Sequence, residues 1–143
     1  MSGPALTGET KPLLSVRDLH IRFASRDGQT VKAVDGISFD VMPGETFGVI
    51  GESGSGKTTL GRALVSLLAP TEGQILHDGI DPQTLGARAL REHRRQYQIV
   101  FQDPHAALDP RQRVLASVCE PLEIAGGLDR AERERRALDA LDR

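Results

Sequence analysis

Eight consecutive residues constrain the fold of this chain more than any other segment: Gly-Glu-Ser-Gly-Ser-Gly-Lys-Thr at positions 51–58. They fit the pattern G-x-x-x-x-G-K-[ST]. The five residues before them, Thr-Phe-Gly-Val-Ile at 46–50, predict a short buried strand. Residues 59–68 predict a helix with an apolar face of Leu60, Ala63, Leu64, Leu67 and Leu68. A strand that enters a glycine loop and then a helix directs several backbone N–H groups at one point, which suits a polyphosphate.

The residue types in the loop fit that chemistry. Glycines let the loop curl tightly with no side chain between backbone and phosphate. Lys57 adds a mobile positive charge, and Thr58 adds a hydroxyl for a magnesium ion. A flexible Gly-Ser linker is the alternative interpretation. A linker would lack the apolar strand and the amphipathic helix on its two sides, so we predict a nucleotide site.

Length and composition restrict the class of protein. A chain of 143 residues is enough for one domain with a core. The formal charge of −2 gives no general attraction to nucleic acid. The single cysteine, Cys119, cannot form an internal disulfide, which favours a reducing, cytosolic setting. The sequence shows no apolar run of about 18–20 residues and no signal-peptide layout, and residues 1–12 predict a disordered tail.

Apolar periodicity outlines the remaining elements. Residues 14–23 predict a first strand with a bulge at Arg17 and Asp18, where the apolar phase slips. Residues 31–41 predict a second, antiparallel strand, and a third begins at 74–76 and turns at 78–79. Residues 84–95 predict a basic amphipathic helix, and 97–101 another short buried strand. From Val114 onward the chain is predicted helical, with a kink at Pro121, an interruption at 126–127, and capping-box spacing between Asp129 and Glu132.

The segments around the loop resemble a known family. Residues 31–41, 43–45 and 51–58 are similar to the opening of ATP-binding cassette (ABC) transporter ATPases. Val-Phe-Gln-Asp-Pro at 100–104 and Leu-Asp-Pro-Arg at 108–111 resemble the Q-loop region of the oligopeptide, dipeptide and nickel importer subfamily. The resemblance implies an α/β P-loop NTPase core with an N-terminal antiparallel β-subdomain and the start of a helical subdomain. On that basis residues 13–143 form a partial ATP-binding domain: the β-subdomain and loop core span about 13–103, and the Q-loop and helical start about 102–143.

The resemblance also implies roles for individual residues. Gly51, Gly54, Gly56 and Lys57 would wrap the β- and γ-phosphates of ATP, and Thr58 would hold Mg²⁺. Gln102 would reach the magnesium and the attacking water, and its loop would touch a transmembrane subunit; the alternative is a polar residue at a strand end. The full predicted nucleotide-binding set is Phe23, Gly51, Ser53, Gly54, Ser55, Gly56, Lys57, Thr58 and Thr59.

Phe23 lies where the family places an aromatic ring that stacks on adenine. Its alternative role is to fill the core of the β-subdomain, because Leu19, Ile21 and Phe23 alternate along one strand.

Several family motifs are not found in the sequence. It contains no Ser-Gly-Gly-Gln-like signature, no apolar strand that ends in Asp-Glu, and no switch histidine beyond such a strand. The last predicted helix reaches Arg143 without a glycine or proline stop, as if the chain were cut in mid-fold. We therefore expect the strand before the loop to lack sheet neighbours, and the 143 residues alone to hydrolyse ATP negligibly.

The resulting hypothesis is an ATP-binding subunit of an ABC importer that couples ATP hydrolysis to uptake of peptides or similar small solutes. Its implied partners are transmembrane permease subunits, a second ATP-binding subunit (identical or related) and, indirectly, a substrate-binding protein. It would lie on the cytoplasmic face of the membrane, bound through the permease. The alternatives are a truncated fragment that binds nucleotide without hydrolysis and a soluble ABC ATPase of another function.

Two further groups of residues are interpreted without a functional role. The basic run Arg88, Arg91, His93, Arg94 and Arg95 lacks interleaved aromatic residues, so we interpret it as a solvated helix face and expect no nucleic-acid partner. The four histidines, His20, His77, His93 and His105, have no ligand-like spacing to one another or to Cys119, so we expect no metal cluster.

Overall fold

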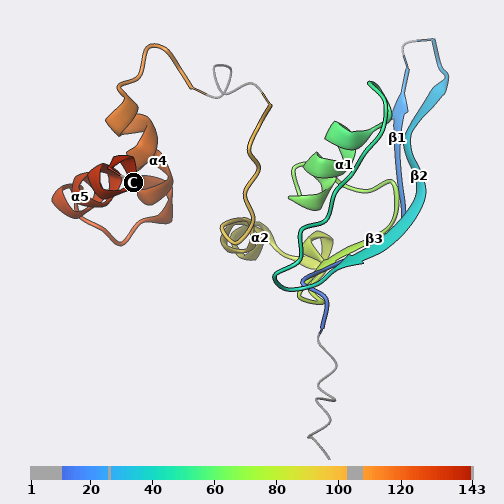
Figure 1. Cartoon of the computed structure of the whole chain (residues 1–143), viewed down its shortest axis with the longest axis horizontal. Helices are drawn as coiled ribbons and strands as arrows, with labels where there is room; N and C mark the ends of the chain where they lie inside the picture. The colour runs from blue at the N-terminus through green and yellow to red at the C-terminus, as the bar shows by residue number, and fades with distance from the viewer. Residues whose placement is uncertain (1–10, 26, 103–107, 143) are drawn as a thin grey trace, which may run out of the picture. The chain divides into compact units, whose positions relative to one another are not determined.

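The computed structural model describes residues 11–25, 27–102 and 108–142. The chain divides into two units, Met1–Ile99 and Val100–Arg143. The first contains β1 (Leu14–Ala24), β2 (Thr30–Val41), α1 (Lys57–Leu64), β3 (Glu72–His77), the 3₁₀ turn η1 (Pro82–Thr84) and α2 (Ala87–Arg94); the strands and α-helices are labelled in Figure 1. The second contains α4 (Val114–Ala125) and α5 (Arg130–Leu141). Most of the predicted tail, residues 1–10, lies outside the described residues.

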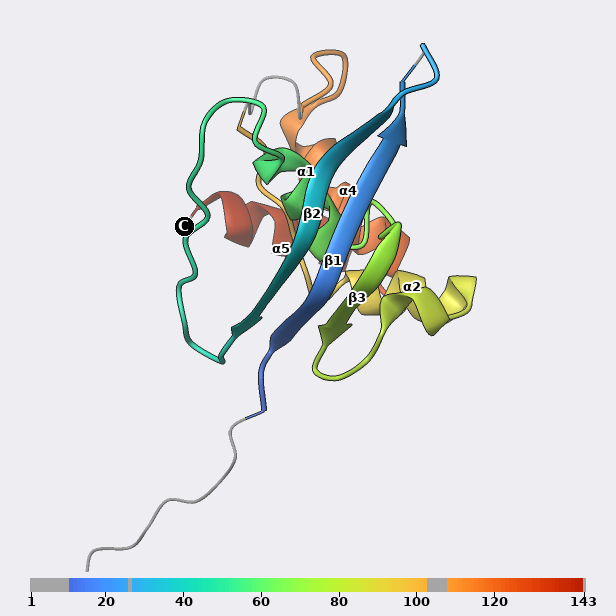
Figure 2. The same cartoon turned by 90° about the vertical axis from the view of Figure 1, so that its right-hand side faces the viewer.

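The three strands form one antiparallel sheet in the order β2-β1-β3 (Figure 2). The predicted bulge is confirmed: the register of β1 shifts between Val16 and Leu19, and Asp18 has a φ of 44°. Gly73 of β3 lies against this bulge, where an added Cβ would be 2.0 Å from the carbonyl oxygen of Asp18. The extra residue in β1 restores the apolar phase, so that Val16 and Leu19 are both fully buried.

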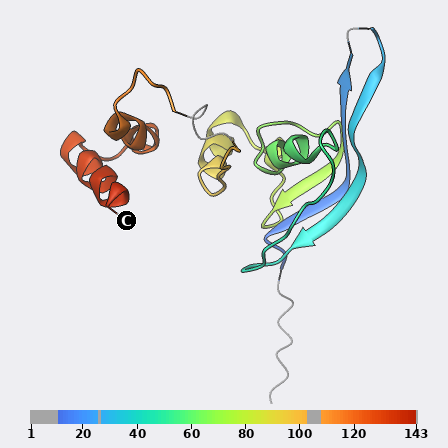
Figure 3. The same cartoon turned by 45° about the horizontal axis from the view of Figure 1, so that its top comes forward.

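Helix α1 covers the inner side of the bent sheet (Figure 3) and completes the core. Its Leu60 and Ala63 pack with five buried strand residues: Val16, Leu19, Ile21, Val34 and Ile75. The helix is shorter than the predicted 59–68. It ends at Leu64 because Ser66 takes a left-handed conformation, with a φ of 59°, and Leu67 is left 54% exposed.

Two predicted buried strands are wrong. Residues 46–50 and 97–101 are not strands, and Ile50 and Val100 are each 96% exposed. A short apolar segment becomes a buried strand only where another strand pairs with its backbone. Within the part of the chain that the structure describes, the single sheet consists of β1, β2 and β3, and it pairs with neither segment.

In the second unit, α4 and α5 bury Cys119 and Ala137. The predicted N-cap of α5 is confirmed, because the Oδ1 atom of Asp129 accepts a hydrogen bond of 2.8 Å from the backbone N–H of Glu132. Ion pairs lie on the surface of the same helix, where hydrogen bonds from Arg135 and Arg136 lower the pKa of Glu132 to about 2. In neither unit is a described helix long and apolar enough to cross a membrane.

Replacement of Leu19 by alanine tests this core. Leu19 is 0% exposed, so we expect Leu19→Ala to lower the free energy of unfolding of the intact protein by about 2–5 kcal/mol. The matched control is Leu67→Ala, whose side chain is half exposed, with an expected loss below about 1 kcal/mol. Denaturant unfolding measures both; equal losses would contradict the assigned core.

Candidate functional site: a phosphate-binding loop

Residues 51–56 curl into a compact loop that leads directly into α1. Gly54 and Gly56 have φ values of 81° and 90°. The backbone N–H of Ser55 donates to the carbonyl of Glu52 at 3.2 Å, which closes the turn. Gly56 is the N-cap of α1, and its carbonyl accepts from the N–H of Leu60 at 2.8 Å. The predicted glycine loop and the helix that follows it are thus formed.

Gly56 sits directly against the backbone of β2. A Cβ atom at this position would be 2.0 Å from the carbonyl oxygen of Ala33, so no side chain fits without a shift of the backbone. This contact places the N-terminus of α1 beside the first third of β2. It explains why a glycine, rather than another small residue, precedes Lys57.

Lys57 is the first residue of α1, and its side chain folds back over the loop. Its Nζ atom donates to the carbonyl oxygens of Gly51 at 2.8 Å and Glu52 at 2.6 Å, and lies 3.4 Å from the Oγ atom of Ser55. The three donors of the ammonium group therefore hold the two ends of the loop together. A positive charge is fixed at the loop itself.

The loop has donors available for an anion. Within the ranges that the structure describes, the backbone N–H groups of Gly54, Gly56, Lys57 and Thr58 have no protein acceptor. The first N–H groups of any helix lack intrahelical acceptors, and they stand at the positive end of its dipole. These amides and the Lys57 ammonium group fit a polyphosphate.

A cavity adjoins these donors. Its volume is about 390 Å³, and it opens between β2 and the loop. Lys32, Ala33 and Val34 line it from β2, and Gly51, Ser55 and Lys57 from the loop side. Lys32 was not among the predicted site residues, and nothing in its sequence context marks it as one, because consecutive residues of β2 line the cavity.

Thr58 and Thr59 occupy the first turn of α1. Thr58 is exposed and Thr59 is half-buried. A threonine hydroxyl is an oxygen ligand of the kind that Mg²⁺ prefers, so Thr58 fits the predicted magnesium contact. Ser53 is likewise exposed on the loop.

The other two predicted residues lie away from the loop in sequence. Phe23 is near the end of β1, opposite Val31, and is 41% exposed, so its ring has a free face. Gln102 is exposed and belongs to the second unit. The adenine contact of Phe23 and the catalytic role of Gln102 stay predictions.

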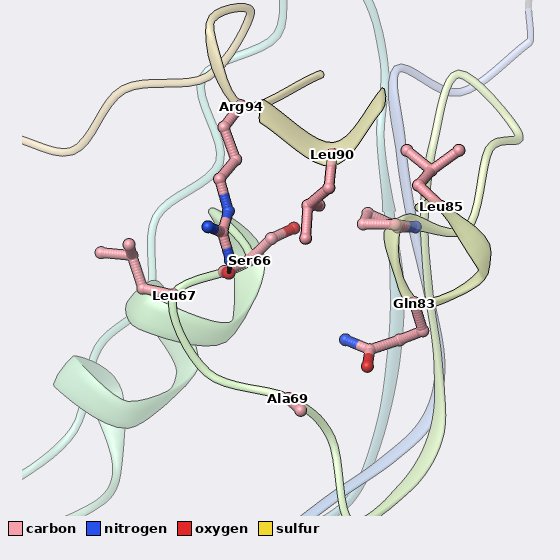
Figure 4. Close-up of a pocket in the computed structure, with 8 residues that line it drawn as sticks. Ser66, Leu67, Ala69, Gln83, Leu85, Leu90 and Arg94 are labelled. Carbon is pink, nitrogen blue, oxygen red and sulfur yellow. Dashed lines mark hydrogen bonds between the residues drawn. The ribbon is translucent and has the colours of Figure 1, made fainter. Parts of the chain in front are cut away.

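The basic helix is shorter than the predicted 84–95, and one of its residues is buried instead of exposed. Helix α2 follows η1; its Arg88, Arg91 and Arg94 are exposed, as predicted, and so is Arg95 directly after the helix. His93 is buried instead, with 7% exposure, so the interpretation as a solvated face is wrong at this residue. Arg94 reaches across a pocket of about 190 Å³, shown in Figure 4, and donates to the carbonyl of Ser66 at 2.7 Å.

The structure also brings together histidines that are far apart in sequence. His77 of β3 and His93 of α2 are in contact, and His20 lies 3.1 Å from carboxylate oxygens of both Asp18 and Asp35. His105 lies outside the described residues. Across the described ranges, no cluster of three or more His, Cys, Asp or Glu residues could hold a metal ion.

Comparison with known proteins agrees with this site. The sequence profile of the ABC transporter family matches residues 34–143. A putative peptide import ATP-binding protein of Brucella ovis is 49% identical over 131 residues, which is 92% of this chain and 41% of that protein. The glutathione import ATP-binding protein GsiA of Salmonella typhi is 49% identical over 124 residues, which is 82% of this chain and 20% of that protein.

Solved structures show the same fold. The dimeric structure of MJ0796, described as a bacterial ABC transporter cassette, matches with a TM-score of 0.76 at 27% identity, over 90% of this chain and 56% of that one. CbiO1 of Clostridium perfringens, part of the ABC transporter complex cbiONQ, matches with a TM-score of 0.70 at 28% identity, over 92% of this chain and 50% of that one.

Fold and loop define a P-loop nucleotide-binding core of the α/β class, with an antiparallel sheet in which β1 and β2 precede the loop and β3 follows α1. The chain belongs to the ABC transporter family. It spans about two fifths of the length of the peptide import relatives it matches.

The contact between Gly56 and β2 can be tested by alanine substitution. Gly56→Ala should lower the free energy of unfolding by about 2–4 kcal/mol, because the new Cβ overlaps the Ala33 carbonyl and the φ of 90° is strained. Gly54→Ala is the control: its φ is 81°, but no atom lies within 4 Å of the new Cβ. Thermal unfolding of both variants distinguishes them, and equal destabilisation would mean that strain alone, without the contact, explains Gly56.

Proposed function

We propose that this chain is the ATP-binding part of an ABC importer subunit that couples ATP binding and hydrolysis to uptake of peptides or similar small solutes. The observation that carries the proposal is the loop at 51–58, with its free amides and the Lys57 ammonium group beside a cavity. The class of solute is supported by relatives whose names give peptide and glutathione import.

The loop would bind the β- and γ-phosphates of ATP. Amides of the loop and of the first turn of α1 would donate to phosphate oxygens, and Lys57 would exchange its carbonyl acceptors for charged ones. Such charge-assisted hydrogen bonds are shorter and stronger than those to neutral carbonyls. A related cassette, MJ0796, has been solved with ADP and Pi bound, which supports ATP as the ligand.

Thr58 and Gln102 would hold Mg²⁺. When bound, Mg²⁺ neutralises charge that develops on the phosphate oxygens. Gln102 would also orient the attacking water, and the exposed ring of Phe23 would stack on adenine.

Permease subunits and a second ATP-binding subunit are the proposed partners, with a substrate-binding protein linked indirectly. Support comes from the MJ0796 cassette, which was solved as a dimer, and from the transporter complex that contains CbiO1. The protein would then lie at the cytoplasmic face of the membrane, held there by the permease.

Removal of the Lys57 charge tests the nucleotide site. In the intact protein, Lys57→Ala should weaken ATP binding by about 10- to 150-fold, since a hydrogen bond from a charged group contributes about 1.5–3 kcal/mol. Lys11→Ala is the matched control, because Lys11 contacts the carbonyl of Asp78 and does not line the cavity. Titration calorimetry measures both; an unchanged affinity in Lys57→Ala would remove the basis of the assignment.

Gln102→Ala should separate binding from turnover. We expect ATP affinity within about threefold of the wild type, and ATP hydrolysis and solute uptake reduced by about 100-fold or more, as for loss of a water-orienting group. Gln98→Ala is the control, an exposed glutamine in the preceding segment. Phosphate release and uptake into membrane vesicles are the measurements. A Gln102→Ala protein that transports at the wild-type rate would exclude the catalytic role.

A further inference from the structure

Two buried histidines form a direct hydrogen bond between β3 and α2. His77 is 1% exposed and His93 is 7% exposed, and the Nδ1 atom of His77 lies 2.9 Å from the Nε2 atom of His93. Their ring centroids are 5.0 Å apart and their planes differ by 13°. The distance between the centroids exceeds the distance between the two nitrogens by about the sum of the two centroid-to-nitrogen distances. The rings therefore meet edge to edge in nearly one plane. This geometry is that of a hydrogen bond, not of face-to-face stacking.

Tyr97 covers the pair. Its ring centroid lies 4.1 Å from that of His77 and 5.3 Å from that of His93. Tyr97 follows α2 in the chain, so the cluster of His77, His93 and Tyr97 joins β3, α2 and the segment after α2. The Arg94–Ser66 hydrogen bond, visible in Figure 4, attaches α2 separately to the residues after α1.

One proton fits between the two rings. A hydrogen bond between imidazoles needs a donor N–H on one nitrogen and a lone pair on the other. A single extra proton enters at an outer ring nitrogen and brings a charge into a buried site, and only when both rings are charged do two N–H groups face each other at 2.9 Å. The Nε2 atom of His77 forms no hydrogen bond of ordinary geometry in the described structure, and the Leu64 carbonyl near the ring only partly offsets the cost of such a charge.

The groups around His77 shift its pKa in opposite directions. Burial lowers the pKa of His77 below its ordinary value, and the neighbouring His93 lowers it further. The Leu64 carbonyl of α1 and the carboxylates of Asp78 and Asp81 act the other way, and their effects are smaller. Tyr97 stays neutral, since burial and then Asp78 raise the pKa of its hydroxyl. His77 is therefore held uncharged at neutral pH.

We propose that the His77–His93 pair is a proton-sensitive latch, which holds α2 on β3 while both buried rings are neutral and share one bridging proton, and which weakens this attachment when a further proton charges the pair. Helix α2 leads through residues 95–101 to Gln102. The consequence for ATP turnover, a loss of coupling in acid, rests on the function proposed above for Gln102; the latch itself does not.

The sign of the pH dependence follows from the lowered pKa. The unfolded or released state takes up the proton near the ordinary histidine value of about 6.5, whereas the closed latch takes it up only at lower pH. The latch is thus fully closed above that value and weakens as the pH falls below it. For one linked proton the closed-to-open ratio falls by at most about tenfold per pH unit.

Hydrogen–deuterium exchange on the intact protein tests the latch. Between about pH 7.5 and about pH 5, after correction for the intrinsic pH dependence of exchange, protection of α2 amides should fall by about tenfold. Amides in β1 and β2 should change by less than about twofold. Unchanged protection of α2 over this range would overturn the proposal.

Two variants separate the latch from a general effect of acid. His77→Gln removes the ring whose pKa burial lowers, and its amide can still hydrogen-bond to His93, so the pH dependence of α2 protection should flatten by at least about threefold. His20→Gln removes a histidine outside the cluster and should keep the wild-type dependence. A wild-type dependence in His77→Gln would overturn the proposal.

Two further measurements complete the test. Should His77→Gln fail to fold, the ring ¹⁵N shifts of the wild-type protein replace it: His77 must titrate below the ordinary histidine value, and titration of His77 at that value would overturn the latch. ATP binding, measured in the same samples, distinguishes a failure of the latch from a failure of the proposed function. A protein that shows the α2 response without ATP binding would contradict the proposed function and support the latch.

Discussion

The phosphate site depends on one close backbone contact, that of Gly56 with the Ala33 carbonyl of β2. This contact fixes where α1 begins, because Gly56 is its N-cap, and α1 in turn carries Leu60 and Ala63 into the core. Residues of β2 and α1 also line the cavity beside Lys57. Core and site are thus built from one arrangement of β2, the loop and α1, so a change that moves the loop off β2 affects stability and ligand binding together.

Local signals in the sequence predicted the elements that depend on neighbouring residues. The loop at 51–58, the bulge near Asp18 and the Asp129 cap each arise from residue types a few positions apart. The turn at 78–79 is similar: Asp78 and Gly79 both have positive φ, as a two-residue hairpin turn requires, and His77 and Ile80 exchange both of their backbone hydrogen bonds.

Features that depend on distant partners were not predictable in this way. Residues 46–50 and 97–101 have the composition of buried strands, but burial needs a paired strand on at least one side. The absence of sheet neighbours was expected for residues 46–50 from the family resemblance, and not from their own composition. The contact between His77 and His93 depends on how α2 packs against β3, and the spacing of the two residues along the chain does not predict that packing. The position of Lys32 at the cavity was not predictable for the same reason. Only the packing of the loop on β2 shows which residues of the strand line the cavity.

Lys57 shows why an ammonium group suits the loop before any ligand arrives. Its three donors match three acceptors, the carbonyls of Gly51 and Glu52 and the hydroxyl of Ser55, which point at one spot from different directions. The planar fork of an arginine presents its donors in one plane and would not satisfy them together. A polyphosphate would draw the ammonium group away from neutral carbonyls toward charged oxygens, a favourable exchange in which the amides of the loop take over the task of holding it curled. Lys57 thus contributes twice, first by shaping the loop and then by contacting the phosphate, and its substitution removes both contributions at once.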